Sequence, residues 1–198
     1  MENIIRQTTE LAMHIVRAYV GPGDVVVDAT CGNGKDTLAL AEMNPAKLYA
    51  FDVQEDAVRK TIRLLEENGC KGSLADGRII VRQLAHENLR EFFYNLDEGS
   101  CPVKVVVFNL GYLPGGDKAI TTKAQTTLAA VQGAMELLST DGLVCITMYS
   151  GHPEGKAEKD AMLEFAEGLD SVKWHVAYIS MPNQKNDPPE ILLITRKQ

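Results

Sequence analysis

The sequence predicts an α/β fold with one seven-stranded, mostly parallel sheet, a last strand that runs antiparallel, and helices on both faces. Strand-like apolar runs alternate with segments of helical periodicity along most of the chain. Residues 25–28 resemble a buried parallel strand and lead through a turn with two glycines into a helical segment. The last two strand-like segments, 172–181 and 190–197, are joined by a loop too short for a parallel crossover, which reverses the last strand.

The expected strands are rich in β-branched and other apolar side chains and stop at glycine, proline or polar residues. The run VKVVVFNL at 103–110 is the most apolar of them, so this strand is expected at the centre of the sheet. The full set spans residues 25–28, 47–53, 78–84, 103–110, 143–148, 172–181 and 190–197.

The expected helices carry apolar side chains three or four positions apart and are followed in several cases by Asn-Pro, Gly or Asp-Gly. They span residues 35–43, 54–68, 86–96, 121–139 and 153–168. Residues 1–20 predict a further, amphipathic helix, which we expect to pack near the ligand site. Its apolar side chains lie roughly on one side: Ile4, Ile5, Leu11, Ile15 and Val16.

The bulk composition predicts one globular domain that covers residues 1–198. The chain is 45% hydrophobic and contains no apolar run long enough to span a membrane, no signal-peptide layout and no internal repeat. Its cysteines, Cys31, Cys70, Cys101 and Cys145, have neither metal-ligand spacing nor a disulfide pattern. We therefore expect buried thiols in a reducing cytoplasm, no metal site and no membrane partner.

The formal net charge of −7 argues against a protein that grips nucleic acid by bulk electrostatics. It leaves room for a local basic patch, for which Arg59, Lys60 and Arg63 on one helix and Lys118 with Lys123 are candidates. A solvated helix face is the alternative interpretation of the first three residues.

The stretch VVVDATCGNGKD at 25–36 is the strongest functional signal. Gly32 and Gly34 remove Cβ atoms where a ligand must lie against the backbone, and the following helix offers unpaired N–H groups. Asp28 ends the strand at the edge where open α/β sheets bind ligands. The stretch predicts a site for a nucleotide-like cofactor.

Two cofactors fit this turn. A nicotinamide dinucleotide site would have a third glycine where this chain has Thr37. Asp52, at the end of the second strand, suits the ribose hydroxyls of that cofactor or of S-adenosylmethionine. With Asp28 before the turn and a reversed last strand, the pattern resembles the Rossmann-like class I S-adenosylmethionine-dependent methyltransferases.

That resemblance implies a role for each part of the turn. Asp28 would meet the ammonium group directly or through water, and backbone N–H groups at 31–34 would meet the carboxylate. Asp52 would accept hydrogen bonds from the ribose, and Val53 and Gln54 would pack beside the adenine. Such enzymes usually carry an acid for the adenine amine after the third strand, and here His86 or the backbone takes that place. A brace for the turn is the alternative interpretation of Asp28.

The stretch that follows the fourth expected strand resembles the Asn/Asp-Pro-Pro-Tyr/Phe loop of amine methyltransferases. This chain has Asn109 and Tyr112, with Leu110 and Gly111 in place of the prolines. In that loop the Asn side chain and the next carbonyl accept hydrogen bonds from the attacking amine, and the aromatic ring stacks on a flipped base. A glycine-rich turn with an incidental tyrosine is the alternative.

The motifs DATCGNGKDT, FDVQ, AHENL, NLGYLPGGDK, GHPEGKAE and NDPPE together resemble a family of small bacterial proteins long labelled putative rRNA methylases. The resemblance covers nearly the whole chain. It implies a tRNA methyltransferase that N-methylates 5-aminomethyl-2-thiouridine at the wobble position. The implied catalytic residues are Asn109, Leu110, Tyr112 and His152. The implied cofactor-binding residues are Asp28, Thr30, Cys31, Gly32, Asn33, Gly34, Asp36, Thr37, Asp52, Val53, Gln54, His86 and Asn109.

Several alternatives stay open at this point. His152 can relay a proton or contact phosphate, or simply begin a helix, and residues 186–190 can shape the substrate pocket or turn the last hairpin. The substrate can be ribosomal RNA or a small molecule instead of tRNA, and the fold can serve as a binding module without chemistry. The N-terminal helix and the last hairpin can each form the face of a homodimer.

Overall fold

The computed structural model describes residues 4–96, 102–111 and 122–197. In these parts of the chain, seven strands form one sheet in the order β3-β2-β1-β4-β5-β7-β6. The strands are β1 (Val25–Asp28), β2 (Lys47–Asp52), β3 (Ile79–Gln83), β4 (Val103–Asn109), β5 (Leu138–Met148), β6 (Trp174–Ile179) and β7 (Glu190–Arg196).

The pairing of the strands confirms the predicted α/β fold. All pairs among β1 to β5 are parallel, whereas β7 pairs antiparallel with both β5 and β6. The last strand is therefore the reversed one, and it lies between β5 and β6. As predicted, β4 is central, and its buried run Val105–Phe108 lies between β1 and β5.

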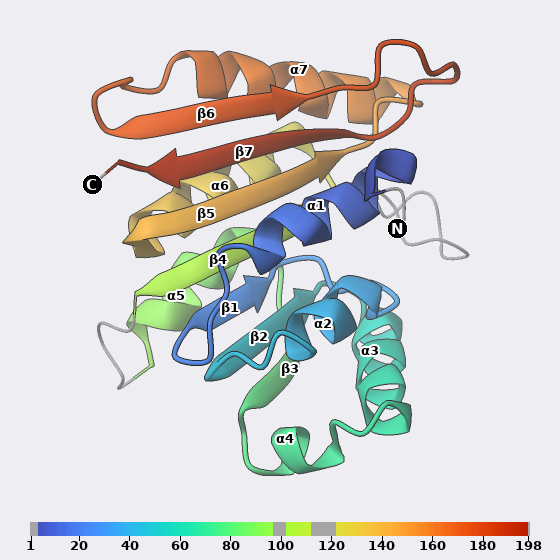
Figure 1. Cartoon of the computed structure of the whole chain (residues 1–198), viewed down its shortest axis with the longest axis vertical. Coiled ribbons are helices and arrows are strands. Elements are labelled where there is room, and N and C mark those ends of the chain that lie inside the picture. The colour runs from blue at the N-terminus through green and yellow to red at the C-terminus, as the bar shows by residue number, and fades with distance from the viewer. Residues whose placement is uncertain (1–3, 97–101, 112–121, 198) are drawn as a thin grey trace.

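The helices form two layers around the sheet (Figure 1). One layer contains α1, α2 and α3, and the opposite layer contains α5, α6 and α7. Short 3-10 turns, Ile4–Arg6 and His86–Asn88, precede α1 and α5. The α-helices are α1 (Thr8–Arg17), α2 (Lys35–Ala41), α3 (Glu55–Glu67), α4 (Lys71–Ala75), α5 (Leu89–Tyr94), α6 (Ala124–Leu137) and α7 (Pro153–Glu167).

A hydrophobic core lies on each side of the sheet. Alternate residues of each strand face opposite sides, so Val26 of β1 packs with Val16 of α1 and Leu40 of α2. On the other side, Val27 packs with the aromatic and aliphatic residues of α5, α6 and α7. Both layers are needed because the strands of a parallel sheet are buried on both faces.

The structure differs from the sequence-based expectation most clearly at three features, besides shifts of a few residues at other ends of elements. Strand β5 begins at Leu138, which pairs with Val103, and the register then shifts so that Leu143 pairs with Val105. The expected N-terminal helix is confined to α1, and Ile4 and Ile5 before it are exposed. The short helix α4 was not predicted because it has no fully buried residue and so no apolar period in its sequence.

Within the described parts of the chain, no helix combines the length and the apolar composition needed to cross a membrane.

The order of the strands places the candidate site. The chain runs outward from β1 through β2 to β3 and then crosses back to β4 on the other side of β1, so the order of the strands reverses between β1 and β4. Ligands of open α/β sheets bind at the carboxyl ends of the strands at such a point. Three strands end there with a polar residue from the predicted site: Asp28, Asp52 and Asn109.

Candidate active site at the carboxyl ends of the central strands

The turn between β1 and α2 is built tightly against α3. Gly34 has a φ of 82°, and a Cβ atom there would lie 2.9 Å from the backbone Cα of Thr61. Glycine is required at this position both by its backbone conformation and by the close approach of α3. The turn is thereby held beside the end of β2.

Asp28 is fully buried beneath the turn. Its Oδ1 accepts a hydrogen bond from the backbone N–H of Thr30 (3.1 Å), and its Oδ2 accepts one from the Thr37 hydroxyl (2.6 Å). Burial and the nearby Asp36 carboxyl raise the pKa of Asp28 to about 7, although both hydrogen bonds oppose the shift. Asp28 braces the turn and places a titratable charge just beneath it.

Backbone groups of the turn are largely bound inside the protein. The N–H groups of Cys31 and Gly34 donate to the carbonyls of Phe51 and Cys31. The N–H of Gly32 donates to Asp52. These groups hold the turn instead of pointing at a ligand, so the first turn of α2 is left to offer N–H groups without partners in the helix.

Asp52 joins the first turn to the second. Its Oδ2 accepts from the N–H of Gly32 (3.0 Å), and its Oδ1 accepts from the N–H of Gln54 (2.9 Å). Two backbone donors therefore fix the orientation of a half-buried carboxylate. Each oxygen keeps a lone pair that can accept a ribose hydroxyl.

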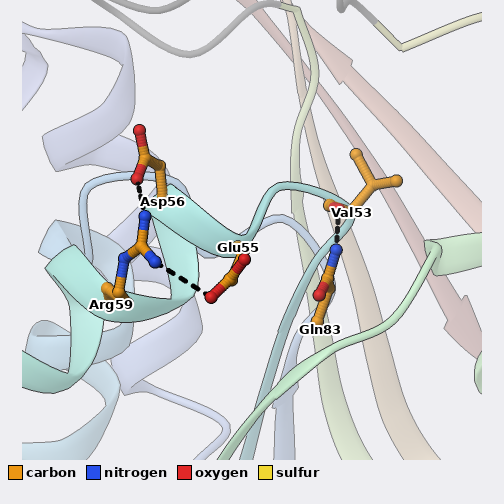
Figure 2. A network of polar contacts seen from close by, with 5 residues as sticks. All are labelled: Val53, Glu55, Asp56, Arg59 and Gln83. Carbon is orange, nitrogen blue, oxygen red and sulfur yellow. Dashed lines mark hydrogen bonds and ion pairs between the residues drawn. The ribbon is translucent and has the colours of Figure 1, made fainter.

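Val53 lies next to Asp52, and its side chain is 53% exposed. The Gln83 side chain on β3 donates to the Val53 carbonyl over 2.9 Å, which fixes this corner of the site (Figure 2). An exposed apolar side chain beside an oriented carboxylate suits one face of an adenine ring.

Two of the three basic residues of α3 are paired with acids of the same helix. Arg59 pairs with Glu55 and Asp56, as Figure 2 shows, and Arg63 pairs with Glu67. These exposed pairs within one helix support the interpretation as a solvated face. Of the other candidate pair, Lys123 is exposed, and Lys118 lies outside the described residues.

His86 follows β3 at the same edge. Its ring lies edge-on to Phe108, and its Nε2 lies 3.7 Å from Oε2 of Glu87. Burial lowers the pKa of His86, although Glu87 and Asp52 oppose the shift, so the ring favours its neutral form at neutral pH. A neutral imidazole can donate to or accept from an adenine ring.

Asn109 is held on both its backbone and its side chain. Its N–H donates to the Thr30 hydroxyl (2.7 Å), and its Nδ2 donates to Oδ2 of Asp36 (2.8 Å). Because the amide nitrogen is bound to a carboxylate, the amide oxygen lies on the opposite side and can act as an acceptor. Asp36 thus fixes the orientation of the Asn109 amide.

Tyr149, directly after β5, completes this group and was missed by the sequence analysis. Burial and Asp36 raise the pKa of Tyr149, while a hydrogen bond from Asn109 opposes the rise, so the hydroxyl stays neutral. Helix α7 begins against it, because a Cβ atom on Gly155 would lie 2.0 Å from the Tyr149 carbonyl. A polar aromatic residue at the end of an apolar strand was the available signal.

We call residues 110–122, which lie between β4 and α6, the acceptor loop, and the structure describes its two ends. Leu110 is buried, and its N–H donates to the carbonyl of Thr147 on β5 (2.9 Å). Gly111 is tied to Thr122, which follows the segment 112–121. Tyr112, predicted to stack on the substrate, lies outside the described residues.

His152 is placed as the N-cap of α7. Its Nδ1 accepts a hydrogen bond from the N–H of Gly155 (3.0 Å). Asparagine, serine and aspartate are the usual N-caps, and here an imidazole nitrogen fills that role. This contact supports the helix-start interpretation of His152.

The loop before β7 is tied to the first helix. The buried Thr8 hydroxyl donates to the carbonyl of Pro189 (3.0 Å). Asn186 and Asp187 both have positive φ, 67° and 47°, which turns the chain back into β7. These contacts support the interpretation of residues 186–190 as the turn of the last hairpin.

The chemistry of the site suits a cationic ligand next to a hydrogen-bond acceptor. Asp28, Asp36 and Asp52 surround one turn, and burial together with the nearby Asp36 carboxyl raises the pKa of Asp28. Burial also raises the pKa of Asp36. A sulfonium or ammonium group placed among these carboxylates would be attracted to all three.

Comparison with known proteins gives a consistent result. Residues 48–195 match the family model described as "Putative rRNA methylase". A protein of Arabidopsis thaliana named "tRNA (mnm(5)s(2)U34)-methyltransferase, chloroplastic" is 34% identical over 199 residues, which cover 97% of this chain and 70% of that protein.

Solved structures with substantial identity agree. A structure described as a putative rRNA methylase from Clostridium thermocellum superposes with a TM-score of 0.86 at 38% identity, covering 96% of this chain and 98% of that one. A putative methyltransferase from Streptococcus mutans, solved in complex with SAH, gives a TM-score of 0.82 at 32% identity, covering 99% of each chain.

Proposed function

The chain belongs to the family described as putative rRNA methylases, and from this premise we propose that it N-methylates 5-aminomethyl-2-thiouridine at the tRNA wobble position with S-adenosylmethionine. The choice of substrate is supported by the likeness to the Arabidopsis tRNA methyltransferase, which extends over 97% of this chain. The free cysteines among the described residues suit a reaction in the reducing cytoplasm.

The described residues fit the cofactor. Asp52 is oriented for the ribose hydroxyls, Val53 offers an apolar face, and His86 lies at the same edge for the adenine. The three carboxylates near the turn suit the two positive charges of S-adenosylmethionine. When bound, the cofactor supplies an electrophilic methyl group.

The protein contributes position and a polar environment to the transfer. Asn109 Oδ1 and the Leu110 carbonyl accept hydrogen bonds from the two N–H groups of a neutral primary amine, which aims its lone pair at the methyl group. The nitrogen bonds to the methyl carbon as the carbon–sulfur bond breaks, and the product ammonium then loses a proton to solvent. The single observation that supports an amine acceptor is the Asp36–Asn109 hydrogen bond, because it fixes the amide oxygen as an acceptor.

Cofactor affinity is expected to rise as the pH rises toward 7. Without a ligand, the pKa of Asp28 is raised from 3.8 to about 7, and a positively charged cofactor should lower it, so binding below pH 7 releases a proton. The Kd for S-adenosylmethionine should fall about tenfold between pH 6 and pH 8, as measured by calorimetry. The sign follows because only the ionised carboxylate attracts the cation.

Asp28→Asn is the control for this pH dependence. The amide can still accept from Thr30 and can donate to the Thr37 hydroxyl, so the turn should keep its shape. The variant should bind the cofactor more weakly at pH 8, with a Kd that hardly varies with pH. A variant that retains the wild-type pH dependence would show that another group titrates.

The proposed function is tested with tRNA from cells that lack this gene. Purified protein and S-adenosylmethionine are added, and nucleosides are identified by mass spectrometry. Conversion of 5-aminomethyl-2-thiouridine to its N-methylated form is the expected result. If tRNA is unchanged and ribosomal RNA becomes methylated instead, the substrate proposal is wrong. The substrate is then ribosomal RNA, as the family description says.

A further inference from the structure

We propose that Glu158 of α7 is a positioning residue for methyl transfer, which acts through the Thr122 hydroxyl to fix the direction of the Leu110 carbonyl. This inference rests on the proposed function, because it concerns the carbonyl that accepts the attacking amine. Glu158 is the last residue of the motif GHPEGKAE, but the sequence analysis gave no role to it or to Thr122, and neither lies on the strands that form the cofactor site.

A pair of hydrogen bonds joins the two ends of the acceptor loop. The N–H of Gly111 donates to Oγ1 of Thr122 (2.9 Å), and the N–H of Thr122 donates back to the carbonyl of Gly111 (3.1 Å). We call this pair the loop clasp. It holds residue 111, the last described residue after β4, against the start of the chain that leads into α6.

The loop clasp determines how the Leu110 carbonyl points. The carbonyl of Leu110 and the N–H of Gly111 belong to one planar peptide unit and point in opposite directions. Binding of that N–H by Thr122 therefore sets the direction of the carbonyl oxygen. The preceding two N–H groups are also bound, by Thr30 and by the carbonyl of Thr147, so three successive peptide units are held by different parts of the fold.

Glu158 determines the direction in which the Thr122 hydroxyl points its proton. Oε2 of Glu158 accepts a hydrogen bond from that hydroxyl over 2.7 Å. An ionised carboxylate can only accept, so the hydroxyl proton must point to Glu158 and the oxygen lone pairs are left for the N–H of Gly111. A hydroxyl oriented the other way would place its proton against that N–H.

The Glu158 carboxyl is built into the protein interior. Glu158 is 2% exposed, and its Oε1 accepts a second hydrogen bond from the buried Thr127 hydroxyl on α6 (2.5 Å). Burial raises the pKa of Glu158, whereas the two threonine hydroxyls and His152 oppose that shift. Each carboxylate oxygen has one threonine donor, and among the described residues only Thr122 of this pair is bonded to Gly111.

This asymmetry provides a matched pair of variants. Thr122→Val removes the hydroxyl of the loop clasp, whereas Thr127→Val removes the other hydroxyl bound to the same carboxylate. In the tRNA assay, Thr122→Val should lower kcat about 30-fold, with KM for tRNA and Kd for the cofactor changed less than about twofold. Thr127→Val should keep kcat within about threefold of wild type.

Two further variants separate positioning from packing. Thr122→Ser keeps the hydroxyl and should restore most of the wild-type kcat. Glu158→Gln keeps the shape of the side chain, but its amide can donate to Thr122, so the direction of the hydroxyl is no longer fixed. This variant should therefore also lower kcat. Thermal unfolding of each variant establishes that a folded protein is being assayed.

Hydrogen exchange tests the loop clasp without any substrate. The amide of Gly111 should exchange faster in Thr122→Val and Glu158→Gln than in wild type, and at the wild-type rate in Thr127→Val. If wild type does not methylate the tRNA, the proposed function fails, and this exchange pattern still decides whether the clasp exists. Equal kcat losses in the two valine variants, or unchanged exchange in Thr122→Val, would overturn the positioning role.

Discussion

Replacing Asn109 by alanine is expected to lower kcat for tRNA methylation about 100-fold, while the Kd for S-adenosylmethionine changes less than about threefold. In the proposed mechanism the amide oxygen of Asn109 accepts a hydrogen bond from the attacking amine, and bonds to Asp36 and Thr30 hold the residue in place. Without it, the nitrogen loses one of its two fixed hydrogen bonds and is less often aligned with the methyl group. Steady-state kinetics and calorimetry measure the two quantities on the same preparation.

Asn68→Ala is the matched control for this prediction. Asn68 is an exposed asparagine after α3, and its side chain donates to the carbonyl of Leu64. Its loss should affect neither kcat nor Kd. Equal losses of turnover and cofactor binding in Asn109→Ala would show that Asn109 holds the cofactor instead of the acceptor.

Replacing Asp52 by alanine is expected to raise the Kd for S-adenosylmethionine about 100-fold. The variant loses the group that we propose as the acceptor for two ribose hydroxyls, and hydrogen bonds to charged groups contribute about 1.5–3 kcal/mol each. It also removes the carboxylate that joins the N–H groups of Gly32 and Gln54, so the two turns are less well held. At saturating cofactor, kcat should fall much less than the affinity for the cofactor, since Asp52 has no proposed contact with the amine that accepts the methyl group.

Asp56→Ala is the matched control for this prediction, because it removes a carboxylate from the first turn of α3, close to Asp52 in the chain. Asp56 pairs with Arg59 on the exposed face of the helix, and it holds neither turn (Figure 2). Its Kd should stay near that of wild type, which separates a contact with the ribose from a general loss of negative charge. A cofactor affinity in Asp52→Ala that matches wild type would remove Asp52 from the ribose site.

The fold could be predicted from the sequence because the apolar runs, the helical periods and the lengths of the connections all indicated the same arrangement. The apolar run at 103–110 was long enough to predict a central buried strand, and β4 is central. The short connection between the last two strands predicted the reversal of β7, which the pairing confirms. The start of β5 was missed because Ser139–Gly142 interrupts its ladder and reads as the end of a helix.

Parts of the candidate site could also be predicted from the sequence, because residues at the carboxyl ends of neighbouring parallel strands must lie close together. Asp28, Asp52 and Asn109 are brought to one edge in this way. The role of Glu158 could not be predicted from the sequence, because its burial depends on how α7 packs against α6 and no local sequence pattern indicates that contact. For His152 the sequence left two roles open, and the hydrogen bond from Gly155 supports the helix cap.

The place of β7 in the sheet affects how the protein is made. The last strand in the chain fills the gap between β5 and β6, and Ile191 on it shares a core with Ala12 and Val16 of the first helix. During synthesis, α1 and β5 therefore emerge well before β7, whereas β6 precedes β7 by only a short loop. The half of the sheet around β1 can form from the earlier part of the chain, but the half that contains β5 closes only after β7 has been made.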